Sequence, residues 1–96
     1  MSKLTKLARD RDCQVRIPGI CNRDPSTTVL AHYRLEGTCG VGIKPNDLLG
    51  AWACSSCHDE CDRRTRKIDA DSAALAHLEG IIRTLDILIR EGVVKA

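Results

Sequence analysis

The stretch CSSCHDECDRR, residues 54–64, carries two cysteines three positions apart and a histidine directly after the second one. Reduced cysteines at this spacing are typical of metal sites. Cys13 and Cys21 form a second, looser pair around the turn at Pro18-Gly19. Because two short-range pairs supply the four ligands of a tetrahedral site, we predict a structural zinc ion bound by Cys13, Cys21, Cys54 and Cys57.

The composition of the chain calls for such a cross-link. Its 96 residues include one Trp, one Tyr and no Phe, whereas small cores usually rely on aromatic side chains for buried area. Zinc binding contributes on the order of 10 kcal/mol to the folding of small zinc peptides. We therefore predict one α+β domain over residues 1–96, with a zinc-bound core at 13–67 and an amphipathic helix at 71–92.

The cellular compartment affects how the cysteines are interpreted. No apolar run follows residues 1–12 to form a signal peptide, and the apolar stretch 48–54 is far shorter than the roughly 20 residues of a membrane span. We expect a cytoplasmic protein without a membrane segment, where disulfides are disfavoured. A redox C-x2-C motif lacks the strand and helix alternation that surrounds it in thioredoxins. Cys61 could replace a ligand or join an iron–sulfur cluster; otherwise Cys39 and Cys61 are spare thiols.

Turn-forming residues separate short apolar pieces between positions 12 and 50. We predict a strand at 27–34 and its return partner at 40–44, joined by a bend at 36–39. Ser55 or Ser56 can cap a helix whose last turn carries the basic residues 63–67.

The last helix shows the clearest pattern. Asp71 or Ser72 can cap it, and Gly92 lies beyond its last turn. Its apolar side chains recur at helical spacing and are expected to pack on the core; they are Leu75, Leu78, Ile81, Ile82, Leu85, Leu88 and Ile89. Ile87 widens this arc, which suggests a second partner, and we hypothesise a homodimer through this helix. His77 is expected at the boundary of the apolar arc.

Two further histidines fit an active site. His58 and Asp62 are four residues apart, so they share a helix face and can converge on one divalent ion. His32 lies in the predicted strand, which the zinc site would bring across this helix. A histidine near a metal is a general-base arrangement. The chain also has two groups of basic residues, which either face phosphates or form solvated surface. They are Lys3, Lys6, Arg9 and Arg11, and then Arg63, Arg64, Arg66 and Lys67.

A strand histidine, a loop asparagine and then C-x2-C-H opening a helix resemble the HNH nucleases of the ββα-metal, or His-Me finger, family. The matching residues are His32, Asn46 and His58. The runs CQVRIPGICN (13–22), VLAHYRLEG (29–37) and DLLGAWACSSCHDECDRR (47–64) also resemble small prophage-encoded nucleases and, more distantly, a RecA-dependent phage nuclease. The resemblance covers residues 13–64 and leaves the last helix as an addition.

This resemblance implies a ββα-metal domain and a metal-dependent endonuclease that hydrolyses DNA phosphodiester bonds. His32 would be the general base, and Asn46 would orient the loop or that base, although Asn46 also fits as the cap of a short helical turn. His58 and Asp62 would hold Mg²⁺ or Mn²⁺. Phosphates would be contacted by Arg34, Arg63, Arg64, Arg66 and Lys67.

One departure from the family supports a second hypothesis. Ala31 stands where the family often places another metal ligand directly before the base. The alternative function is a zinc-stabilised module that binds DNA, or a recombination or repair protein, and whose nuclease site is inactive.

Overall fold

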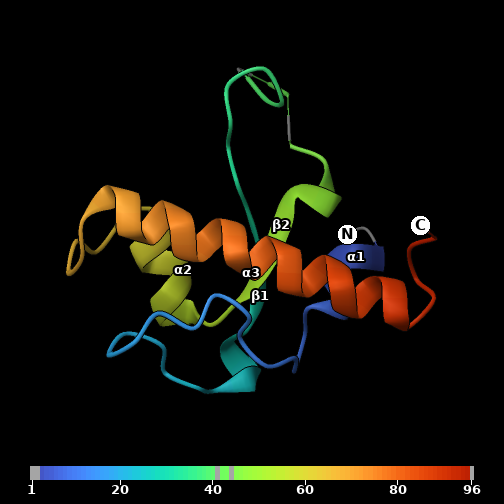
Figure 1. Cartoon of the computed structure of the whole chain (residues 1–96), viewed down its shortest axis with the longest axis horizontal. Helices are drawn as coiled ribbons and strands as arrows, with labels where there is room; N and C mark the ends of the chain where they lie inside the picture. The colour runs from blue at the N-terminus through green and yellow to red at the C-terminus, as the bar shows by residue number, and fades with distance from the viewer. Residues whose placement is uncertain (1–2, 41, 44, 96) are drawn as a thin grey trace.

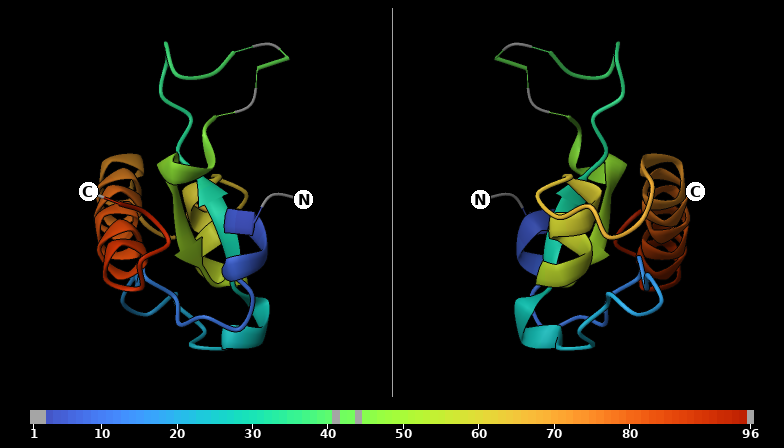
Figure 2. Two further views of the ribbon diagram at one scale, coloured as in Figure 1. Left: turned by 90° about the vertical axis from the view of Figure 1, so that its right-hand side faces the viewer. Right: turned by 90° about the vertical axis from the view of Figure 1, so that its left-hand side faces the viewer.

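Two short antiparallel strands, β1 (Val29–His32) and β2 (Gly50–Ala53), form the sheet at the centre of the molecule. The computed structural model describes residues 3–40, 42–43 and 45–95. Helix α3 (Ala70–Arg90) covers one side of the strands, while α1 (Lys3–Leu7) and α2 (Ser55–Cys61) lie on the other (Figures 1 and 2). Two 3₁₀ turns, η1 (Pro25–Thr27) and η2 (Asp47–Leu49), precede the two strands. The protein is thus a small α+β domain.

The predicted partner of the first strand is wrong. β1 pairs with β2, so that Val29 lies opposite Ala53 and His32 opposite Gly50. Within the predicted partner 40–44, Gly40 and Ile43 form only an isolated bridge, and positions 41 and 44 lie outside the described residues. All four residues of β2 are buried, because helices cover both sides of the sheet. A strand buried on both faces lacks the alternation that marks a half-exposed strand in a sequence.

The chain between β1 and η2 forms an arm. In Figures 1 and 2 the segment after Tyr33 runs away from the body of the molecule and returns at η2. Leu35 and Ile43 on this arm are exposed. The arm brings Asp47 back beside the end of β1, which places two distant parts of the sequence at one site.

Helix α2 begins and ends earlier than predicted. Its cap is Cys54, whose Sγ accepts a hydrogen bond from the Cys57 N–H at 3.4 Å, rather than Ser55 or Ser56. Its end is a Schellman motif: Arg63 adopts a left-handed φ of 60°, and the Arg64 N–H donates to the Asp59 carbonyl at 2.9 Å. The basic residues 63–67 therefore lie in the loop that follows α2 and not in its last turn.

This loop folds around one buried carboxylate. Glu60 has no exposed surface, and it accepts hydrogen bonds from the Thr65 hydroxyl at 2.6 Å and the Ile68 N–H at 2.9 Å. Arg63 lies 3.4 Å from the same carboxylate and donates to the Ile68 carbonyl at 3.0 Å. Glu60 thus fixes the path from α2 into α3.

Helix α3 confirms the predicted C-terminal helix but not its buried face. Its cap is Asp69, two residues before Asp71, and Gly92 follows its end with a left-handed φ of 76°. The buried residues of α3 are mostly small or polar: Ala73, His77, Gly80, Ile81, Thr84 and Leu88. Within the predicted stripe, Leu75, Leu78, Ile82 and Ile89 are exposed.

Close packing explains this choice of face. A Cβ atom at Gly80 would lie 3.1 Å from Val15 Cα and 3.2 Å from Val15 N, so the helix approaches the backbone of the first loop. Only a face of small side chains permits such an approach. The larger leucines and isoleucines consequently point outward. None of the described helices is both long and apolar enough to cross a membrane.

Candidate functional site

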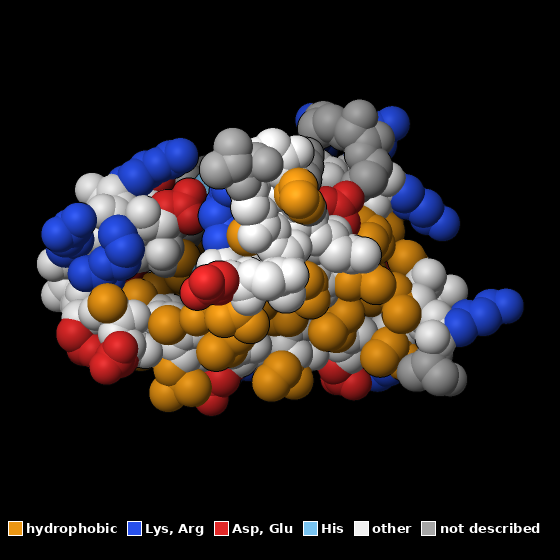
Figure 3. Space-filling view, turned by 90° about the horizontal axis from the view of Figure 1, so that it is seen from above, with side chains coloured by type: hydrophobic (Ala, Val, Ile, Leu, Met, Phe, Trp, Pro, Cys, Tyr) orange, Lys and Arg blue, Asp and Glu red, His pale blue; other side chains and the backbone are white. Residues whose placement is uncertain are grey.

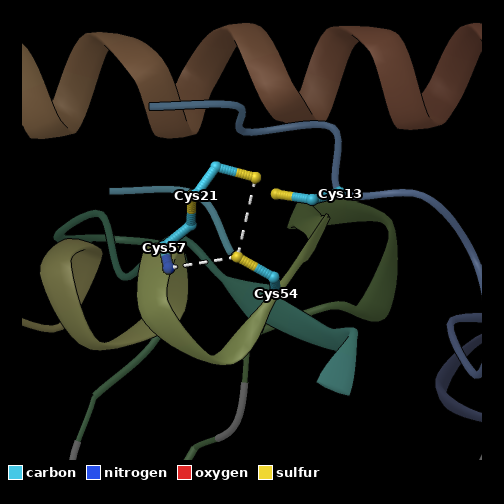
Figure 4. A group of neighbouring side chains, drawn as sticks. All are labelled: Cys13, Cys21, Cys54 and Cys57. Carbon is cyan, nitrogen blue, oxygen red and sulfur yellow. Dashed lines mark hydrogen bonds between the residues drawn. The ribbon is translucent and has the colours of Figure 1, made fainter. Parts of the chain in front are cut away.

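Four cysteines from distant parts of the chain meet beside the N-terminus of α2. The Sγ atoms of Cys13, Cys21, Cys54 and Cys57 all lie within 4.8 Å of one another (Figure 4). Cys13 and Cys21 come from the loop before β1, Cys54 caps α2, and Cys57 lies in its first turn. Four sulfur ligands at such distances match a structural zinc site. The prediction that these four cysteines form one group able to bind metal is confirmed.

The backbone around the cluster donates hydrogen bonds to sulfur. The Arg16 N–H donates to Cys13 Sγ at 3.5 Å, in a turn that holds Arg16 at a left-handed φ of 54°. Arg23, two residues after Cys21, has a similar φ of 56°, and its backbone N–H also donates to that sulfur. Donors of this kind stabilise thiolates. The turns therefore provide the environment that a metal tetrathiolate requires.

Two thiols of the cluster have pKa values shifted in opposite directions. A hydrogen bond from Cys57 lowers the pKa of Cys13 to about 4, and the same bond together with burial raises the pKa of Cys57. The hydrogen bond between these two thiols therefore favours the thiolate form of Cys13. The donor set fits a divalent cation that prefers sulfur.

The two remaining cysteines lie outside this group. Cys39 belongs to the arm, where its Sγ lies 3.8 Å from the Leu35 carbonyl oxygen. Burial raises the pKa of Cys61 to about 12, so its thiol stays neutral. Neither sulfur belongs to the four-sulfur cluster, as expected for spare thiols.

His32, the last residue of β1, has a carboxylate partner. Its Nε2 lies 2.7 Å from Asp47 Oδ1, and both side chains are largely buried. Since an ionised carboxylate only accepts hydrogen bonds, the proton of this contact belongs to Nε2, and Nδ1 is the ring nitrogen that Asp47 does not engage. The sequence analysis missed Asp47, although the turn signal at residues 45–47 contains it.

Asn46 caps the turn that carries Asp47. Its Oδ1 accepts a hydrogen bond from the Leu48 N–H at 2.8 Å and thereby caps η2, the turn that carries Asp47. The contact with His32 therefore belongs to Asp47, while Asn46 shapes the turn that presents it.

His58 and Asp62 lie on one face of α2, as their spacing predicts. His58 Nε2 is 3.1 Å from Asp62 Oδ2, and their side chains are 28% and 35% exposed. Asp62 and His32 line the same cavity of about 410 Å³, together with Arg34, Cys61 and His77. One member of each histidine–carboxylate pair, His32 and Asp62, thus lines the same solvent-accessible cavity.

His77 is buried, not a boundary residue. Its Nε2 donates to the Ala31 carbonyl at 2.8 Å, and its ring lies 5.2 Å from that of Tyr33. Burial lowers the pKa of His77, which favours the neutral ring. His77 therefore contacts Ala31 and Tyr33, the residues on either side of His32. The position of His77 beside the apolar arc did not predict these contacts.

The basic residues divide into two roles. Arg63 is occupied by Glu60 and the Ile68 carbonyl, so it stabilises the loop. Arg64 lies 3.6 Å from Asp59 and 3.8 Å from Asp62, whereas Arg66 and Lys67 are exposed. Figure 3 shows Lys and Arg side chains gathered at the end of the molecule formed by this loop. Arg34 and Arg63 both line the cavity.

The chain has close relatives among known proteins. It matches the family described as "Putative nuclease YbcO" over residues 2–93. It is 58% identical, over the full length of both chains, to "Putative nuclease YbcO" of Escherichia coli (strain K12) and to "Putative nuclease ybcO" of Enterobacteria phage 82. A solved "Structure of a putative bacteriophage protein from Escherichia coli str. K-12 substr. MG1655" is also similar, with a TM-score of 0.82 and 53% identity. The match covers 93% of this chain and 99% of that chain.

Proposed function

The chain belongs to the family described as "Putative nuclease YbcO", and we propose that it is a metal-dependent endonuclease that hydrolyses phosphodiester bonds in DNA. The observation that carries this proposal is the cavity lined by His32 and Asp62. His32 is paired with the carboxylate of Asp47, and Asp62 is paired with the imidazole of His58. The order of β1, β2 and α2, with one histidine ending the first strand and another in the helix, supports the HNH type.

The cysteine cluster is the proposed site of a structural zinc ion. Its four sulfurs fill a tetrahedral shell, so a zinc ion bound there cross-links the chain and leaves no position for water or substrate. Cys54 and Cys57 belong to α2, and Cys13 and Cys21 to the first loop. Binding at this cluster would fix the helix that carries His58 and Asp62.

His32 is the proposed general base. Nδ1 is the nitrogen that can accept a proton from an attacking water, because Nε2–H is engaged by Asp47. Asp47 would hold the ring in this tautomer and stabilise its protonated form, as the carboxylate does in a catalytic triad. Asn46 would support the same arrangement through the cap of η2.

His58 and Asp62 are the proposed ligands of Mg²⁺ or Mn²⁺. Their donor atoms already converge, and both side chains are partly exposed, so a hydrated ion has access. A divalent cation at this position neutralises charge on the scissile phosphate and on the leaving oxygen. Arg34, Arg64, Arg66 and Lys67 would bind neighbouring phosphates, which gives affinity without sequence choice.

Plasmid cleavage tests this function. The zinc-loaded wild type should convert supercoiled DNA in the presence of Mg²⁺ or Mn²⁺, and we expect His32→Ala to reduce the rate about 10²- to 10⁴-fold. DNA binding in a mobility-shift assay and the thermal unfolding midpoint serve as controls and should stay near the wild-type values. A His32→Ala protein that cleaves as fast as the wild type would exclude the general-base role.

One observation favours the alternative function. Ala31 is buried, and His77 holds its carbonyl, so no ligand occupies the position directly before His32. A module that binds DNA or a recombination protein without cleaving would show retained DNA binding and no cleavage with any divalent ion.

A further inference from the structure

The outer face of α3 carries a regular apolar stripe, which we call the seam: Leu75, Leu78, Ile82, Leu85 and Ile89. Their spacing of three, four, three and four residues is the repeat by which helices pair in coiled coils. Leu75 and Ile82 are 59% and 67% exposed, and Leu78 and Ile89 are 43% and 41% exposed. Figure 3 shows a band of hydrophobic side chains along the side of the molecule that α3 forms.

Of the five seam residues, only Leu85 packs in part against the core of the single chain, and the other four are exposed. The opposite face of α3, which includes His77, Gly80 and Thr84, packs on the sheet and the first loop. Nothing in the described part of the chain covers Ile82. The helix therefore has one face that builds the domain and a second, larger apolar face that remains in water, where isolated domains rarely place such a stripe.

We propose that the seam pairs with the seam of a second copy of this chain, in an antiparallel homodimer centred on Ile82. About a twofold axis at this residue, Leu78 of each copy meets Leu85 of the other, and Leu75 meets Ile89. Every position from 75 to 89 on the seam is Leu or Ile, so each contact is apolar. Because the seam is complementary to itself, a second copy of the chain is the partner that fits it.

Charge at the helix ends sets the direction. Asp71 occupies the next seam position toward the N-terminus, so a parallel pair in register would place two carboxylates against each other. An antiparallel pair instead brings Asp71 to the C-terminal end of the other helix, where Arg90 and Lys95 lie. The two helix dipoles then point in opposite directions, which is the favourable arrangement. Asp86 flanks the seam but is already paired with Arg90 at 2.6 Å.

The size of the seam determines how strong the dimer is. The 21 residues of α3 span about 31 Å, or about three heptads. Two helices of this length bury an area at the low end of the roughly 1,200–2,000 Å² of specific interfaces. A reversible dimer with a dissociation constant of about 1–100 μM is therefore expected.

Sedimentation equilibrium of the zinc-loaded full chain tests the dimer. From about 1 to about 500 μM, a range chosen to bracket the expected constant, the average mass of the wild type should rise from monomer to dimer. Ile82→Lys should weaken association at least about 100-fold, because it buries an unpaired charge at the centre of the seam. Ile82→Leu should dimerise like the wild type, as should Lys6→Gln in α1, on the side of the sheet opposite α3. Circular dichroism should show all variants folded.

A wild type that stays monomeric at the highest concentration would overturn the proposal, as would dimerisation of Ile82→Lys at the wild-type affinity. The direction has its own test. Asp71→Lys should weaken an antiparallel dimer a few-fold at low salt, since it places a positive charge near Arg90 and Lys95 of the other copy. An affinity left unchanged by Asp71→Lys would overturn the antiparallel arrangement, because in a parallel pair the substitution replaces one like-charge contact with another.

Discussion

The two ends of helix α2 have opposite surroundings. At its N-terminus, Cys54 and Cys57 have no exposed surface and lie in a cluster of four sulfurs within 4.8 Å. Toward its C-terminus, His58 and Asp62 are about a third exposed, and Asp62 lines a cavity. The buried end can hold the helix in place, while the open end can admit water, an ion and a phosphate. The short helix α2 thus joins the proposed structural metal site to the proposed catalytic site.

The largest expected effect comes from breaking the buried end. Cys57→Ser removes one sulfur of the cluster, and we expect the chain to be largely unfolded at room temperature. Metal binding at small zinc sites contributes on the order of 10 kcal/mol, which is comparable with the whole stability of a domain. Circular dichroism and metal analysis by mass spectrometry measure the loss of both structure and zinc.

Cys39→Ser is the matched control, because Cys39 lies on the arm outside the cluster. It should bind one zinc per chain and unfold at the wild-type temperature. Zinc retained at full stoichiometry by Cys57→Ser would contradict the assignment of the ligands.

A smaller effect is expected at the open end. Asp47→Asn keeps the shape of the side chain but removes the charge that pairs with His32. We expect plasmid cleavage to fall about 10- to 100-fold with little change in stability, because the carboxylate no longer stabilises the protonated ring. Initial rates at saturating Mg²⁺ measure the effect.

Asn46→Asp provides the comparison for this prediction. It preserves a cap for η2, since an aspartate oxygen accepts the Leu48 N–H equally well. Cleavage should remain near the wild-type rate. If Asn46→Asp and Asp47→Asn reduced the cleavage rate equally, the rate would depend on the conformation of the turn and not on the charge of Asp47.

The smallest effect concerns the loop that joins the open end to α3. Hydrogen bonds from the Thr65 hydroxyl and the Ile68 N–H hold the pKa of Glu60 below its usual value of 4.5. A lowered pKa stabilises the folded state above the unfolded pKa, and this contribution is lost as the pH falls through the folded pKa. Glu60→Gln should lower the melting temperature at neutral pH by several degrees.

The difference between wild type and Glu60→Gln should shrink as the pH falls from about 5 to about 3. Melting curves across this range measure it, and taking the difference removes the shared contributions of Asp69 and Glu91, whose pKa values are also lowered. A constant difference between the two proteins would show that the carboxylate charge of Glu60 does not stabilise the loop.

Local spacing predicted much of this molecule. The pairs around Cys13 and Cys54, the shared face of His58 and Asp62, and the last helix all follow from distances of a few residues along the chain. The strand partner was not predictable in this way. The run GAWA of β2 carries no alternation, because both of its faces are covered, and the glycine-rich segment 40–44 gave the stronger turn and strand signal.

The candidate site was predictable only in part. Spacing and the family resemblance pointed to His32, His58 and Asp62, and the structure brings His32 and Asp62 to one cavity. Asp47 and His77 were missed because their partners lie 15 and 46 residues away, at distances where no sequence period applies. The contact of Arg63 with the buried Glu60 was not predicted either, and its phosphate-binding role stays a prediction.

Residue spacing was enough to identify the candidate metal ligands and the last helix, because ligand type and helical period are local properties. It gave no sign of α1 and placed the end of α2 too late. The buried face of α3 depends instead on how the helix packs against distant parts of the chain. The approach of Gly80 to Val15 selects the small face of the helix and leaves the seam of leucines and isoleucines outside. Hydrophobicity alone favours the seam for the core, but the fit of two backbones at close range overrides it.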